Sequence, residues 1–206
     1  IVRLLEEECE SQSEAFANEV MQTLKDEELM QSCGAMPLLM FESVSDPRFS
    51  HAYAKLYSAK QKILRNIAGL FKEELLGLYA KYSETLPKNG FCPAILSAQF
   101  KRNAVRNLIL TILAALDSAD VQELISTQYH TAESATVRLS ALSLYLSSSA
   151  ADRRELLAEE LARSALHPLA FENCIAAAAN TARDTVSYLR MIEESPMETV
   201  VEPTAV

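Results

Sequence analysis

The second half of the chain is divided into short helical segments by a series of helix-capping residues. Between the breaks, apolar residues recur at intervals of three and four, the spacing that gives an α-helix one buried face. Ser, Asp and Pro stand at the breaks, where they favour the first turn of a helix. No window alternates apolar and polar residues as a half-buried strand does. The segments expected to be helical are 94–116, 119–130, 135–148, 151–165, 169–180 and 183–194.

The beginning of the chain is also expected to be helical. Ser13 is a suitable N-cap, and from Phe16 onward the apolar residues follow helical spacing. Gly34 is an expected stop signal, because glycine readily adopts the left-handed conformation that ends many helices. The stretch 36–43 is expected to form a short helix or turn.

A long helix is expected to follow the pair Asp46 and Pro47. Asp46 can cap free amides, and Pro47 at the first helical position loses nothing by lacking an N–H. The apolar stripe behind this start signal continues as far as Tyr79. Gly69 or Gly77 is expected to mark a kink or a division into two helices.

The composition agrees with an all-α fold. The chain contains only 4 glycines and is 49% hydrophobic, so it favours helices and can bury a core. Short helices joined by brief connections pack as antiparallel neighbours. We therefore expect antiparallel helix pairs stacked as an α-solenoid of the armadillo or HEAT kind, or as a bundle-like array.

We expect residues 1–206 to form one helical domain. The mixture of Pro, Asn-Gly and polar residues in 83–93 predicts a loop, which gives a subdivision into 1–86 and 94–195. Because the chain begins at Ile1 rather than at a methionine, we expect it to be a fragment of a longer chain.

The net charge and the spacing of the cysteines limit the classes of partner and the cellular compartment that we expect for this chain. A formal net charge of −9 argues against nucleic acid, because phosphate binding needs clustered Lys and Arg. No apolar run is long enough to span a bilayer, so no membrane partner is expected. The cysteines form no CxxC pair, and we expect reduced thiols in a cytoplasmic protein. These cysteines are Cys9, Cys33, Cys92 and Cys174.

The sequence predicts no catalytic, metal-binding or cofactor-binding residue in this chain. His51, His130 and His167 fall in separate predicted elements, and none belongs to an HExxH motif. No GxSxG elbow is present for acyl transfer. His130 stands at a predicted helix end, where it is expected to interact with the helix dipole or the last carbonyls.

Acidic and small-residue clusters are expected to be structural. The run Glu6-Glu7-Glu8 with Glu10, and the pair Glu159-Glu160, are interpreted as solvated faces, because adjacent helical residues point in different directions. The alanines 176–179 are interpreted as a close-packing helical surface.

Arg102 and Arg106 lie one turn apart on one predicted helix, with Asn107 beside the second arginine. Two roles fit this spacing. The arginines bridge to acidic groups on a neighbouring helix, or they contact an anionic ligand.

Two segments resemble the C-terminal helical domain of zinc aminopeptidases of the aminopeptidase N (alanyl aminopeptidase) type. Residues 102–107, with Leu110 and Leu113, are similar to that family's R-x-A-L-R-N-x-x-L-x-x-L run. Residues 128–142 are similar to its Q-[FY]-x-x-A-x-N-M-T-D-x-x-A-A-L segment. The family's Asn-Met-Thr-Asp is replaced here by 134–137, which implies a distant relative. The residues of this packing motif are Arg102, Arg106, Asn107, Gln128, Ala132, Thr136 and Leu142.

The resemblance implies a non-catalytic domain of a hydrolase that removes N-terminal residues from peptides. The parent's zinc would be held by an HExxH motif and a distal Glu in a separate catalytic domain, and the helical domain would cap the active-site chamber and limit peptide access. Its partners would be the parent's catalytic domain and, through it, peptide substrates. The alternatives are a HEAT- or armadillo-like protein-interaction scaffold without an enzymatic parent, or a helical oligomerisation module.

Overall fold

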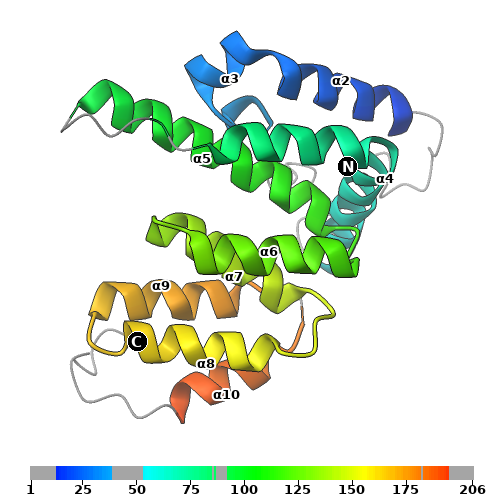
Figure 1. The fold of residues 1–206 in the computed structure, drawn as a ribbon. Helices are drawn as coiled ribbons and strands as arrows, with labels where there is room; N and C mark the ends of the chain where they lie inside the picture. Colours follow the sequence, from blue (N-terminus) through cyan, green and yellow to red (C-terminus); the bar gives the residue numbers. More distant parts are fainter. Residues whose placement is uncertain (1–12, 39–52, 85, 87–91, 182, 195–206) are drawn as a thin grey trace. The chain divides into compact units, whose positions relative to one another are not determined.

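The computed structural model describes residues 13–38, 53–84, 86, 92–181 and 183–194, and all regular elements within these ranges are helical (Figure 1). The expected all-α class is therefore confirmed. The elements are α2 (Ser13–Lys25), α3 (Glu27–Cys33), the 3₁₀ helix η1 (Met36–Leu38), α4 (Tyr53–Ser83), α5 (Pro93–Ala114), α6 (Ala119–Thr131), α7 (Ala135–Ser147), α8 (Arg153–Ser164), α9 (Pro168–Ala179) and α10 (Thr185–Glu193).

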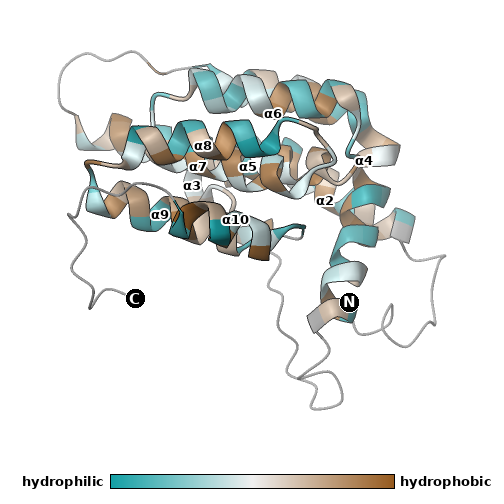
Figure 2. Cartoon of the chain, turned by 90° about the horizontal axis from the view of Figure 1, so that it is seen from below, coloured by the Kyte–Doolittle hydropathy of each residue, from teal (hydrophilic) through white to brown (hydrophobic). Residues whose placement is uncertain are grey.

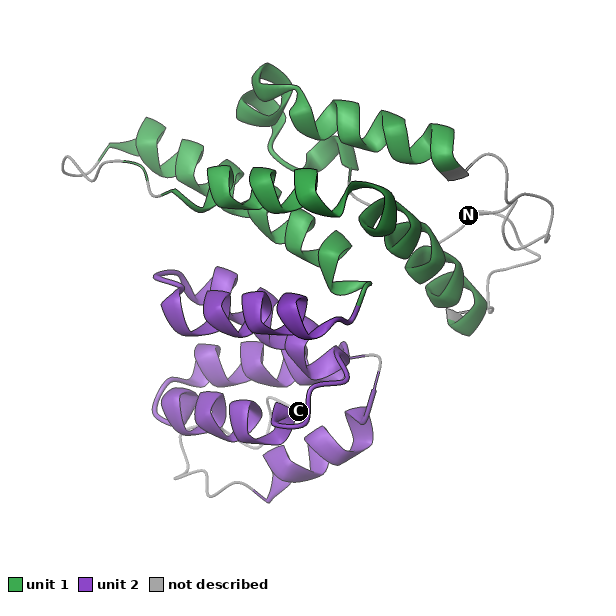
Figure 3. Cartoon of the chain, turned by 45° about the vertical axis from the view of Figure 1, so that its right-hand side comes forward, with its two compact units in different colours: residues 1–116 green, residues 117–206 purple. Residues whose placement is uncertain are grey.

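The chain divides into two compact units, residues 1–116 (unit 1) and 117–206 (unit 2) (Figure 3). The sequence placed a subdivision in 83–93 instead. That position differs because α4 and α5, on either side of it, pack against each other within unit 1. The backbone N–H of Leu86 donates to Gln99 Oε1 (3.0 Å), which ties the start of this connection to α5.

In unit 1 the first expected helix is split into α2 and α3 at Asp26. The Asp26 carboxylate accepts a hydrogen bond from the Leu29 N–H (2.9 Å), so it caps a new helix instead of continuing the old one. Gly34 ends α3 as expected. Its φ of 62° suits glycine, and its N–H donates to the Met30 carbonyl (2.9 Å).

Helix α4 is 31 residues long and kinked. The non-helical residue is Phe71 (φ −125°, ψ 27°), two positions after one of the two glycines expected to mark a kink. Helix α4 packs against α2 and α5, and α5 also packs against α3. Fully buried apolar side chains from these helices form the core of unit 1; they include Met21, Leu24, Met30, Ile67, Leu75, Ile109, Leu110, Ile112 and Leu113.

Unit 2 consists of α6–α10, each contacting its neighbours in the chain. Helices α6 and α7 pair, α7 contacts both α8 and α9, and α10 contacts α8 and α9. Contacts to the next helix and to the next but one are those of a helical stack, as in an α-solenoid. Hydrophilic and hydrophobic residues are interspersed along α6 and α8 (Figure 2), as they are in helices that bury one face. Tyr129, Tyr188 and Phe171 are the largest fully buried side chains of this unit.

Several sequence-based expectations lie outside the described residues: the acidic run 6–10, most of 36–43, the start signal at Asp46 and Pro47, and His51. Among the helices that the structure does describe, none is both long enough and apolar enough to cross a membrane.

Candidate functional site

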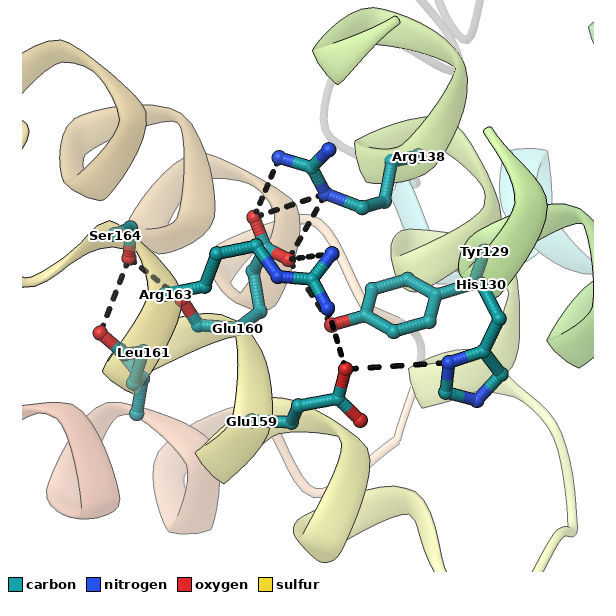
Figure 4. A network of polar contacts seen from close by, with 8 residues as sticks. All are labelled: Tyr129, His130, Arg138, Glu159, Glu160, Leu161, Arg163 and Ser164. Carbon is teal, nitrogen blue, oxygen red and sulfur yellow. Dashed lines mark hydrogen bonds and ion pairs between the residues drawn. The ribbon is translucent and has the colours of Figure 1, made fainter. Parts of the chain in front are cut away.

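A buried carboxylate joins the first three helices of unit 2. The side chain of Glu160 on α8 is only 1% exposed. It accepts hydrogen bonds from the hydroxyl of Tyr129 on α6 (3.0 Å) and from the guanidinium of Arg138 on α7, whose Nε lies 3.0 Å from Oε2 (Figure 4). Both carboxylate oxygens of Glu160 accept hydrogen bonds from N–H groups of Arg138, so the ion pair is held in a fixed orientation.

The network continues from Glu160 to the surface of unit 2. Arg163 lies 3.9 Å from Glu160 Oε2 and donates to Glu159 Oε1 (2.6 Å), and its guanidinium lies over the Tyr129 ring. Nδ1 of His130 is 3.9 Å from Glu159 (Figure 4). His130 thus stands in the last turn of α6, as expected, and its Nδ1 faces a carboxylate on α8. Arg163 therefore connects the buried carboxylate of Glu160 to the exposed carboxylate of Glu159.

The environment of this network disfavours the ionised forms of Tyr129 and Cys174. Burial raises the pKa of Tyr129, and the negative charge of Glu160 and its hydrogen bond to the hydroxyl raise it further. Burial and the charge of Glu160 likewise raise the pKa of the Cys174 thiol to about 12, so that Cys174 is inert near neutral pH. Since the Glu160 oxygens are occupied by Tyr129 and Arg138, we conclude that this cluster fixes the packing of α6, α7 and α8.

The expectation that Glu159 and Glu160 form a solvated face is wrong for Glu160. Glu159 is exposed, but Glu160 is buried. The spacing of the apolar residues indicated this position, because Glu160, Leu161 and Ser164 lie three, four and seven residues after Leu157, on the buried face of α8. Its partners come from helices that lie elsewhere in the sequence, and this part of the site was not predictable from the local pattern.

A second polar cluster joins three inter-helix connections at one edge of unit 2. Asp117, which precedes α6, accepts hydrogen bonds from the Ser149 backbone N–H (2.8 Å) and the Gln122 side chain (3.0 Å). It also forms an ion pair with Arg183 (3.5 Å) in the connection before α10. Asp117 has a φ of 51°, a left-handed conformation that aspartate tolerates better than most residues. Sequence analysis did not identify this cluster, because Ser149 and Arg183 lie 32 and 66 residues from Asp117 in the chain.

The arginine pair of α5 lies in unit 1, against the last turns of α4. Arg102 donates to the carbonyls of Lys81 (2.5 Å) and Glu84 (3.4 Å), and its guanidinium lies 5.4 Å from the centre of the Tyr82 ring. It therefore caps the carboxyl end of α4, where cations are favoured. The expected bridge to an acidic group is wrong for Arg102 among the described residues.

Arg106 has no carboxylate within ion-pair distance in the described part of the chain. Its Nε atom, like that of Arg102, is sealed from solvent and has no hydrogen-bond partner. Burial, only partly offset by interaction with Tyr79, lowers the pKa of Arg106. The charge of this half-buried side chain is therefore poorly compensated, whereas the guanidinium of Arg102 is engaged by the carbonyls at the end of α4.

The other residues of the expected packing motif occupy different environments. Gln128 and Leu142 are buried, and the Gln128 side chain donates to the Val137 carbonyl at 3.4 Å. Ala132 is half-buried at the end of α6, and Thr136 is exposed. The structure therefore joins Gln128 to α7, but it gives Thr136 no core-packing role. The carbonyl of Asn107, half-buried on α5, accepts a hydrogen bond from Thr111 Oγ1 at 2.8 Å.

No group of three or more His, Cys, Asp or Glu side chains in the described ranges is arranged to hold a metal ion. Cys33, Cys92 and Cys174 are free cysteines, and Cys9 lies outside the described residues. The alanines on α9 divide between two environments: Ala177 and Ala178 are buried, whereas their neighbours 176 and 179 are exposed. The expected close-packing surface is thus confirmed for the middle pair.

Comparison with known families places these helices in a repeat family. A family model described as a domain of unknown function (DUF3458_C) with ARM repeats matches residues 1–206, and the chain belongs to this family. The stacked helices of unit 2 are the local form that such repeats take. A search of curated proteins found no match.

Proposed function

We propose that this chain is a non-catalytic helical domain of a zinc aminopeptidase that removes N-terminal residues from peptides. The observation that carries the proposal is the resemblance of 102–113 and 128–142 to the C-terminal domain of aminopeptidase N enzymes. In the structure these stretches lie on α5 and on α6 with α7, where Val105, Gln128 and Leu142 are buried. Membership of an ARM-repeat family supports the same assignment at the level of the fold.

In this proposal the domain caps the active-site chamber and limits which peptides enter. The zinc and its ligands belong to the parent's catalytic domain, and no step of the hydrolysis is assigned to residues 1–206. The partners are that catalytic domain and the peptides it admits, and the setting is cytoplasmic. The acidic net charge of −9 favours protein and peptide partners over nucleic acid.

A protein-interaction scaffold is the second candidate, and a specific observation favours it. On the first turns of α5, Leu96 and Phe100 are largely exposed and lie four residues apart on one helical face. Stacked helical repeats commonly present such faces to partner proteins. A scaffold would need no zinc and no catalytic domain.

The two candidates can be separated with the natural protein that contains this domain and with a shortened form that lacks residues 1–206. Both forms are assayed for bound zinc and for cleavage of an aminoacyl anilide and of polypeptides of increasing size. An aminopeptidase retains zinc in both forms, and loss of the domain relaxes its discrimination against large substrates. Absence of zinc and of aminopeptidase activity from the natural protein would leave the scaffold as the better account.

A further inference from the structure

Arg106 occupies a position on α5 where its charge is not matched within the described chain. Arg102 and Arg106 lie one helical turn apart and share the side of α5 that faces α4. Arg102 is engaged by the carbonyls at the end of α4 and by the Tyr82 ring. Arg106 stands beside Tyr79 instead. The guanidinium of Arg102 thus stabilises the packing of α4 on α5, whereas that of Arg106 forms no corresponding hydrogen bond to α4.

The protein exposes only part of the Arg106 side chain. Its Nε is sealed from solvent without a hydrogen-bond partner, whereas the side chain as a whole is half-buried. Of the guanidinium nitrogens of Arg106, Nε alone is both sealed from solvent and without a hydrogen-bond partner. A guanidinium in this state has lost some of its hydration without gaining a counter-charge. A bound anion would offset this desolvation cost by pairing with the charge.

We propose that Arg106 is a docking point for an acidic side chain of another polypeptide, whose carboxylate accepts hydrogen bonds from the terminal nitrogens of the guanidinium. The planar guanidinium matches a planar carboxylate, and one uncompensated positive charge matches one negative charge. This inference concerns a surface of unit 1 and does not depend on the proposed enzymatic parent.

Charge complementarity favours a carboxylate over a phosphate. A phosphate group carries close to two charges and is usually held by several cationic groups, but Arg102 is already engaged with α4. The chain as a whole is acidic, so a free polyanion would be repelled at long range. An acidic residue on an otherwise uncharged polypeptide avoids most of this repulsion.

The most direct test is to follow the arginine Nε–H signals of the 206-residue protein by nuclear magnetic resonance. The Nε–H of Arg106, sealed from water, is expected to exchange slowly and to give an observable signal. Addition of a blocked peptide that carries one glutamate among uncharged residues should shift this signal in a saturable manner. The same peptide with glutamine in place of glutamate should leave the signal in place, and inorganic phosphate should shift it less than the glutamate peptide.

Matched variants make the result specific. R106A and R106K lack the Arg106 Nε–H signal, so their binding of the glutamate peptide is measured by calorimetry. R106A should weaken this binding by about tenfold or more, and R106K by a smaller factor, because lysine keeps the charge but lacks the planar fork. R190A removes one exposed positive charge from α10 and should leave binding unchanged. Equal weakening by R106A and R190A, or no saturable shift, would overturn the proposal. So would R106A lowering stability without changing peptide binding.

Discussion

The two units place their polar side chains in different environments. In unit 2, Gln128, Ser148, Glu160 and Ser164 are buried, and several of them connect different helices. In the described part of unit 1 the buried side chains are apolar, and ion pairs such as Lys25–Glu74 and Lys81–Glu27 lie on the surface. One unit thus connects its helices through internal polar contacts, and the other mainly through apolar contact.

Helix length gives a physical reason for this difference. Helices α4 and α5 of unit 1 contain 31 and 22 residues, whereas the helices of unit 2 contain 9 to 13. A long helix offers many apolar contacts that fix its position along a neighbour. A short helix offers few and is marginal on its own, so directional contacts from Glu160 and Asp117 can determine its register.

The largest effect is expected when the buried ion pair of unit 2 is broken. R138M leaves the Glu160 carboxylate in the core without its principal cation, and this should lower the free energy of unfolding by about 3 kcal/mol. Tyr129 remains as a hydrogen-bond donor and limits the loss. Urea unfolding followed by circular dichroism measures the change.

The double variant R138M/E160M is the control for this prediction. It removes both charges and replaces them with apolar groups, so it should be clearly more stable than R138M alone. If both variants lose the same free energy, the pair does not act as a compensated buried charge and the comparison between the units fails.

A smaller effect is expected at the edge cluster of unit 2. D117A removes the acceptor of the Ser149 and Gln122 hydrogen bonds and leaves alanine at a φ of 51°, so a loss of about 2 kcal/mol is expected. D117N tolerates the same backbone conformation and keeps an acceptor, and it should lose about half as much. Equal losses in thermal unfolding would assign the effect to charge alone.

The same cluster should make the stability of unit 2 depend on acid. Burial alone would raise the pKa of Asp117, but hydrogen bonds from Ser149 and Gln122 and the charge of Arg183 together lower it. Because the pKa of Asp117 is lower in the folded state, its ionised carboxylate stabilises the protein at pH values above the unfolded-state pKa of about 3.9. This contribution to stability is lost as the pH falls through the folded-state pKa. The stability difference between the unaltered protein and D117N should therefore shrink from about pH 4 downward. An unchanged difference throughout acid titration would contradict the assignment.

The smallest effect is expected at the surface of unit 1. Lys25 and Glu74 are each about half exposed, so K25M should change the free energy of unfolding by less than about 1 kcal/mol. Added salt should reduce the difference further, because exposed charges are screened. A loss as large as that of R138M would remove the contrast between the two units.

Local patterns in the sequence predicted the helices of unit 2 closely. The expected helix 135–148 is observed as Ala135–Ser147, and 169–180 as Pro168–Ala179. Capping residues and apolar spacing act within one or two turns of chain, which explains this agreement. The same reasoning missed the break at Asp26, because the interval of five residues from Leu24 to Leu29 was accepted as part of one helical pattern.

The polar clusters were harder to predict because they depend on contacts between distant parts of the chain. Glu160 resembles its exposed neighbour Glu159 in the sequence, and only packing against α6 and α7 gives it Tyr129 and Arg138 as partners. Arg106 was identified as a candidate for an anionic contact, but the sequence could not show that Arg102, and not Arg106, would donate to carbonyls at the end of α4.

The most direct test of the proposed function is to determine the coding sequence upstream of Ile1 in the natural gene. The proposal predicts a thermolysin-like domain that contains HExxH followed by a second glutamate one or two helices later. Further helical repeats upstream, without that motif, would contradict an aminopeptidase parent and would favour a scaffold built from the same kind of repeat.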